Sequence, residues 1–167
     1  MSRTVSLTLR TALNAEQTGE TTIFLITVVH PSLGTPLRFS SDPTTRLTVD
    51  PLQYGTVSRG NTYNFLPIGL VMPDDSDQTP PAMKLVLDNV MRDAIPLLRS
   101  ISTPATVTIE MVLASAPDTV EVAWTGFDLV NVDYNDGSIS ADLTINALVT
   151  EPYPAGSFTP SGFGGLF

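Results

Sequence analysis

The run TVTIEMVLAS (106–115) constrains the fold most strongly, because its residues alternate between apolar and polar. A period of two is typical of a β-strand with one buried and one exposed face. A second alternation follows NDGS (135–138), in which Gly137 supplies a position that tolerates positive φ and so predicts a hairpin turn. The residues predicted to point inward are Val107, Ile109, Met111 and Leu113 in the first run, and Ile139, Ala141, Leu143, Ile145 and Ala147 in the second.

Other segments predict further strands. TTIFLITVVH (21–30) is apolar on both faces, which predicts a strand covered on both sides, and residues 36–42 are predicted to return as its hairpin partner. Shorter strands are expected at 83–90, 119–124 and 127–134.

The middle of the chain is less regular. Residues 42–61 are rich in Asp, Pro, Thr and Gly and predict a long loop with a short strand at 46–49. Residues 61–73 predict one strand that contains Pro67 and therefore lies on an edge or is bulged there. About eight strands with little helix predict a mainly β chain forming a single β-sandwich or barrel.

Two short helices are expected in addition. Between Val5 and Gln17, apolar residues have helical spacing, Ser6 is a candidate N-cap and Gly19 a candidate stop, although the start of this segment also alternates like a strand. A second helix is predicted at 93–101, with Asp93 as N-cap and Pro96 in the first turn.

Composition excludes several classes of function. The formal net charge is −9, so general binding to nucleic acid or to an anionic membrane is disfavoured. There are no cysteines, which removes disulfides, thiolate nucleophiles and Cys-based metal sites. No apolar run approaches the roughly 18 residues of a membrane span, and the N-terminus lacks a secretory signal, so we expect a chain made in the cytosol.

Few residues suggest catalysis or ligand binding. His30 is the only histidine and precedes Pro31, a natural turn position, where a plain exposed or capping histidine is favoured over a catalytic one. Asp74, Asp75 and Asp77 are candidate Ca²⁺ ligands, but they lack EF-hand spacing, so a solvated loop is favoured. The sequence therefore predicts no enzyme activity, no cofactor and no metal.

Several stretches resemble a known family. SLTLRTALNAEQTGE, SSDPTTRLTVDPLQYGTVSRGNTYNFLP, LLRSISTPATVTIEMVLASAPDTVE and the ending EPYPAGSFTPSGFGGLF are similar to a tail protein family of long-tailed phages and prophages, whose members are mostly of unknown function. The ending departs from the family at Gly164, where Pro is expected. In addition, AMKLVLDNVMRDAIPLLRS and PATVTIEMVLAS resemble the β-barrel domains of distal-tail and tail-hub proteins.

The resemblance implies a virion structural protein made in the host cytoplasm. It implies a ring of identical subunits in the tail tip, with six copies favoured and three as the alternative. Expected neighbours are the tail tube, tape-measure and tail-tip proteins, without nucleic acid or membrane. Two other roles stay open: an assembly protein absent from the mature virion, and a receptor- or carbohydrate-binding module. The candidate sugar-binding residues are Trp124, Tyr134 and Tyr153.

The C-terminal segment carries the predicted interface. We expect residues 1–150 to form the β domain and 151–167 to form an extended arm without a helical or strand period. Its apolar side chains would either insert into a neighbouring subunit or tail partner or fold back over the same chain. The candidate interface residues are Tyr153, Phe158, Phe163, Leu166 and Phe167.

Overall fold

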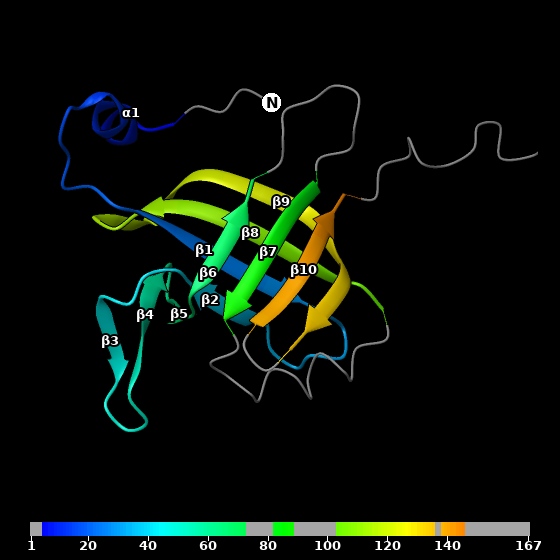
Figure 1. Cartoon of the computed structure of the whole chain (residues 1–167). Coiled ribbons are helices and arrows are strands. Elements are labelled where there is room, and N and C mark those ends of the chain that lie inside the picture. The colour runs from blue at the N-terminus through cyan, green and yellow to red at the C-terminus, as the bar shows by residue number, and fades with distance from the viewer. Residues whose placement is uncertain (1–4, 73–81, 89–102, 136–137, 146–167) are drawn as a thin grey trace, which may run out of the picture.

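The computed structural model describes residues 5–72, 82–88, 103–135 and 138–145. These residues form one helix and ten strands, and the strands join in a single mixed sheet (Figure 1). The strand order is β3-β4-β5-β2-β1-β8-β9-β10-β7-β6, and only the pairing of β2 with β5 is parallel. The mainly β prediction is confirmed. The sheet is open, since β3 and β6 stand at its two ends.

The elements have the following bounds. The helix α1 spans Leu7–Asn14. The strands are β1 (Thr22–Val29), β2 (Leu37–Ser40), β3 (Thr45–Thr48), β4 (Gln53–Ser58), β5 (Asn61–Phe65), β6 (Ile68–Val71), β7 (Ala82–Asp88), β8 (Ala105–Leu113), β9 (Ala116–Tyr134) and β10 (Ser138–Thr144).

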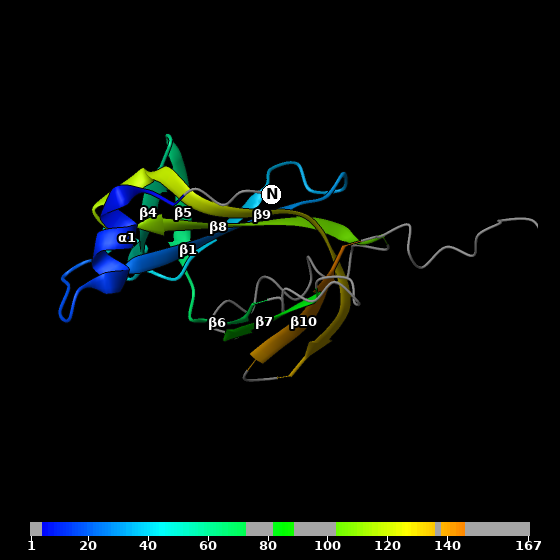
Figure 2. The same ribbon diagram turned by 90° about the horizontal axis from the view of Figure 1, so that it is seen from above.

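The sheet folds over on itself and encloses a core between two layers. The strand β9 is 19 residues long and curves from the layer that holds β1 and β8 to the layer that holds β10, β7 and β6 (Figure 2). Apolar side chains from both layers meet between them, which gives the packing of a β-sandwich within one sheet. The buried residues of this core are Ile26, Val28, Met83, Leu85, Ala105, Val107, Ile109, Phe127 and Leu143.

A second apolar cluster lies on the other face of β1. Ile23 and Leu25 of β1 pack there with Val112 of β8 and Tyr63 of β5. Since β1 also contributes Ile26 and Val28 to the core between the layers, it is buried on both faces. This confirms the prediction drawn from the apolar run at 21–30.

Two irregularities allow β9 to curve. Gly126 has φ +76° and lies opposite the register shift between Val107 and Ile109 of β8. Asn131 has φ +50° and lies beside a second shift, in the pairing with β10. Such bulges increase local twist and bend a strand. The sequence predicted two strands here, at 119–124 and 127–134, and that was wrong because Gly126 bends the strand without ending it.

Register shifts also change which residues of β8 are buried. Val107, Ile109 and Leu113 are buried as predicted, but Val112 was expected to face outward and is fully buried, whereas Met111 is half-buried. The register with β9 shifts on both sides of Val112. In addition, the second cluster covers the other face of β8 at this end, so strict alternation no longer decides burial.

The middle of the chain differs most from the predictions. Residues 42–61, expected to be mainly loop, contain β3 and β4, and only the short strand near 46–49 was foreseen. The single strand expected at 61–73 is two strands separated by Leu66 and Pro67. The strand β5 pairs with β4 and β2, whereas β6 pairs with β7 at the edge of the sheet. Proline cannot donate to a ladder, which explains the break.

The N-terminal helix agrees with its capping signal. The Ser6 hydroxyl accepts a hydrogen bond from the Leu9 amide at 3.1 Å, as an N-cap does. The helix ends at Asn14, so Gly19 is not its stop. Leu9 is buried, and no helix in the described ranges is long and apolar enough to cross a membrane. The second predicted helix, at 93–101, lies outside the described residues.

Candidate functional site

The predicted interface residues of the C-terminal arm all lie outside the described residues, as do Asp74, Asp75 and Asp77. Trp124 is partly buried and packs against the core, which disfavours a role as an exposed sugar platform. Tyr134 ends β9, and the position of its side chain is not described. Across residues 5–72, 82–88, 103–135 and 138–145, no three His, Cys, Asp or Glu side chains gather in a metal-binding arrangement.

His30 has a structural environment. It is buried, its Nδ1 accepts the Ser32 amide at 3.1 Å, and its Nε2 lies 2.6 Å from the Thr103 hydroxyl. Because Nδ1 is an acceptor, the ring proton belongs on Nε2, which donates to Thr103. His30 thus links the turn after β1 to the segment that leads into β8. This agrees with the capping alternative, whereas the expectation of an exposed histidine was wrong.

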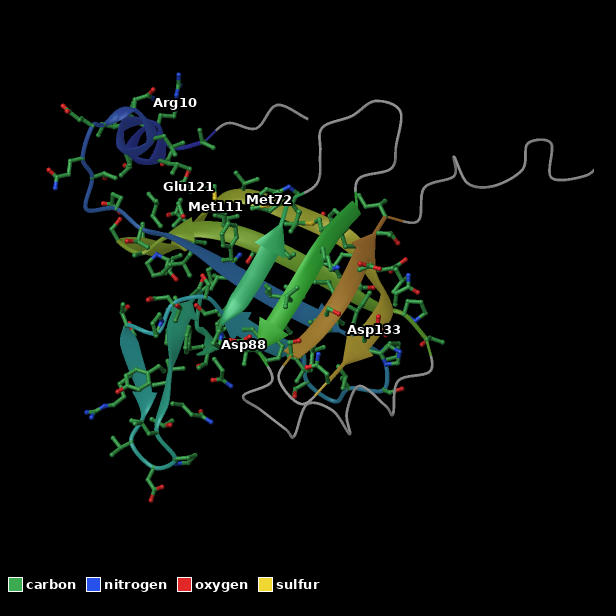
Figure 3. The ribbon with its side chains drawn as sticks, in the orientation of Figure 1. Arg10, Met72, Asp88, Met111, Glu121 and Asp133 are labelled. Carbon is green, nitrogen blue, oxygen red and sulfur yellow. The ribbon has the colours of Figure 1, made fainter. Side chains whose placement is uncertain are left out.

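Glu121 is a second buried polar side chain and lies near the N-terminal helix. Its carboxylate accepts the backbone N–H of Ser6 at 2.7 Å (Figure 3). Because Ser6 is the N-cap of α1, this bond attaches the start of the helix to β9. The arrangement is structural.

The most distinctive feature of the described surface is the β3–β4 hairpin. It stands away from the two layers (Figure 1). The turn residues Val49 and Leu52 are 71% and 59% exposed, and Tyr54 of β4 is 40% exposed. Exposed aromatic and aliphatic side chains gathered on one projecting element make this hairpin the candidate contact surface of the described residues.

A buried polar network supports the base of this hairpin. The hydroxyls of Ser40 and Thr56 lie 2.8 Å apart and link β2 to β4. The Ser58 hydroxyl donates to the carbonyl oxygen of Pro117 at 2.7 Å and links β4 to β9. Ser40 and Ser58 are fully buried, so these bonds satisfy groups that would otherwise be costly to desolvate.

Arg59 forms the strongest link between the hairpin and the body. Its guanidinium donates from Nη1 to Glu110 at 3.1 Å and from Nη2 to the other carboxylate oxygen, and its backbone N–H donates to Asp118 at 2.5 Å. The hydrogen bonds to Glu110 raise the pKa of Arg59, against a smaller opposing effect of burial. Two parallel charge-assisted bonds fix direction as well as distance.

Arg59 and Gly60 also make the turn between β4 and β5. Their φ values are +48° and +74°, and Ser58 pairs with Asn61 on either side. Two successive positive φ angles are the pattern of a type I′ turn, which prefers Asn-Gly. Here Arg takes the first position and adds the contact with Glu110.

This dual role leads to a testable prediction. We expect Arg59→Ala to destabilise the fold by up to about 1 kcal/mol, because it loses the partly exposed ion pair, while the positive φ of a non-glycine residue is the same as in the wild type. Arg59→Asn loses the same ion pair but suits the turn, so it should cost less. Urea unfolding of the three proteins measures the difference. Equal losses in both variants would contradict the assignment of the type I′ turn.

Sequence reasoning missed β4 and the turns on either side of it, although two signals pointed to those turns. Asp50-Pro51 is a turn dipeptide, and SRGN (58–61) places a glycine between two polar segments. Both were interpreted as parts of one loop because Thr, Asp and Pro dominate the segment.

Comparison with known proteins adds one match. The chain matches the domain of unknown function DUF1833 over residues 8–158. A search of curated proteins found no match. The match covers most of the sequence, including every described strand. The chain therefore belongs to the DUF1833 family.

Proposed function

We propose that the protein is a structural component of a phage tail. It acts as a distal-tail or tail-tip ring subunit that adapts the tail tube to the tip complex, without catalysis. The sequence resemblance to phage tail proteins leads to this proposal. The observation in the fold that supports it is the projecting β3–β4 hairpin with its exposed Val49 and Leu52, since a ring subunit needs surfaces that bind neighbours.

The proposal assigns partners and location. The chain is made in the host cytoplasm and is incorporated into the virion tail, where its neighbours are further copies of itself and the tail tube, tape-measure and tail-tip proteins. In the described part of the chain, both ring nitrogens of His30 make hydrogen bonds that connect segments of the fold. This supports a structural role for the protein over an enzymatic one.

Mass spectrometry of purified phage particles tests this role. We expect the chain in several copies per particle, in constant ratio to the tail tube protein. Its absence from particles whose assembly nevertheless requires the gene would support the alternative, an assembly protein that leaves before maturation. A binding module at the tail tip would also be present in particles. It would bind to glycans on an array, whereas a ring subunit would not bind them.

The C-terminal segment provides a second prediction. If the arm inserts Phe158, Phe163 and Phe167 into a neighbour, a chain truncated after Thr150 should lose self-association, since each well-buried Phe contributes about 1.5–3 kcal/mol. Native mass spectrometry of the two forms measures this. An unchanged oligomer would mean that the arm folds back over its own chain or binds another tail protein, and a lower melting temperature of the truncated chain would support the first of these.

A further inference from the structure

We propose that copies of this chain join through the two ends of the described sheet, with β3 of one copy adding to β6 of the next. This inference rests on the proposed ring and names the contact that builds it. The sheet ends in β3 on one side and in β6 on the other, and each pairs with a single described strand, β4 and β7 respectively. Among the described residues, each therefore has one edge of backbone donors and acceptors to which a further strand can add.

The two edges match in length, and neither carries an acidic residue. Each strand has four residues. The strand β6 contains no charged residue, and β3 contains one, Arg46. The whole chain carries −9, so two copies repel each other over most of their surfaces. Contact through edges without acidic residues adds nothing to that repulsion, and β6 lacks the charges that natural edge strands usually carry when they stay unpaired.

Exposed apolar residues adjoin both edges. On the hairpin, Val49 and Leu52 follow β3 directly, and on the other edge Val71 ends β6 at 63% exposure and is followed by Met72 at 37%. A parallel pairing of β3 with β6 of the next copy brings these two groups together at the same end of the new ladder. Main-chain bonds would supply the association, and the apolar groups would fix the register.

The inner faces of the two strands are already occupied. Ile68 and Leu70 of β6 pack against the core, and Leu47 of β3 is half-buried over Gly55. The exposed residues of β6 are Gly69 and Val71, and Gly69, which has no side chain, leaves the backbone of β6 accessible. The contact is heterologous, because the two edges differ, and repetition of such a contact around an axis forms a ring when the rotation closes.

Sedimentation velocity and native mass spectrometry of the full chain over a range of concentrations test the contact. The wild-type protein should form oligomers whose mass is a multiple of 17.9 kDa. Leu52→Lys with Val49→Ser should reduce it to a monomer, and Val71→Lys alone should do the same. All three positions are exposed, and thermal melting checks that the variants remain folded. Leu13→Lys, at a 70% exposed site on α1, is the matched control and should leave the oligomer unchanged.

Mixing the two variants identifies the pairing. The hairpin variant keeps an intact β6, and the Val71→Lys variant keeps an intact hairpin, so the mixture should contain a dimer of one chain of each and no larger species. A contact of β3 with β3 predicts instead that Val71→Lys oligomerises alone. That result would overturn the proposal. So would oligomers that persist in both variants, or a wild-type chain that stays monomeric because another tail protein occupies the edges. Presence of the chain in virions is measured separately, so the ring contact can fail while the tail assignment stands.

Discussion

Gly55→Ala is expected to destabilise the fold by about 3 kcal/mol or more, in the upper tail of single substitutions. A Cβ at this position would lie 1.9 Å from the Tyr63 carbonyl oxygen, 2.8 Å from Leu47 Cδ1 and 3.0 Å from the Phe65 amide nitrogen. Two of these three atoms are backbone, which cannot rotate aside as a flexible side chain can. The strands β4 and β5 must therefore separate to admit one methyl group.

The consequences extend beyond the hairpin. The strand β5 also pairs with β2, and Tyr63 beside Gly55 packs in the second apolar cluster. Movement of β5 would expose that cluster and lengthen the contact between the Ser40 and Thr56 hydroxyls. We therefore expect unfolding at lower urea concentration together with loss of amide protection in β4 and β5.

Gly69→Ala is the matched control. This glycine also lies within a strand, but its Cβ would be 3.7 Å from Val86 Cβ and 3.8 Å from the Val86 carbonyl oxygen, which are ordinary contacts. We expect a change within about 0.5 kcal/mol, as for most surface substitutions. If Gly55→Ala proved equally mild, the close approach of β4 to β5 would be wrong.

The sequence predicted those elements whose burial follows a simple period. The segment 21–30 has apolar residues on both strand faces, so β1 was identified as a strand covered on both sides. Ile139, Ala141 and Leu143 alternate strictly, and all three are buried in β10. The helix α1 follows from a capping serine ahead of helically spaced apolar residues. In each case local pattern and tertiary environment agree.

The misjudged elements depend on contacts between distant segments. The strand β4 has polar and small residues because its neighbours are the Tyr63 carbonyl oxygen and the buried Ser40 hydroxyl. Likewise, Gly126 in the sequence predicts the end of a strand, and only the pairing of β9 with β8 shows that it lies in a bulge. The parallel pairing of β2 with β5 joins two strands that the turn rules do not connect. The exposed apolar residues beside β3 and β6 lie at the two ends of the described sheet because of the strand order, which a single sequence does not specify.

Phe127→Ala is the second substitution with a large expected effect, and it should lower the free energy of unfolding by about 3–5 kcal/mol. Phe127 is 2% exposed and lies in the core between the layers, directly after the bulge at Gly126. Because β9 belongs to both layers, a cavity here weakens the contact between them. That loss is a large fraction of the roughly 5–15 kcal/mol by which domains are stable.

Two companion variants separate packing from local strand effects. Phe127→Leu keeps an apolar group of similar reach and should cost clearly less than the alanine variant, because the remaining cavity is smaller. Val57→Ala removes apolar atoms from a strand residue that is 48% exposed and should change stability by less than about 1 kcal/mol. If the slope of the unfolding free energy against denaturant concentration is the same in all variants, the shifts in midpoint report stability alone. If Phe127→Ala cost no more than Val57→Ala, the two layers would not share a common core at this strand, and β9 would not be the element that joins them.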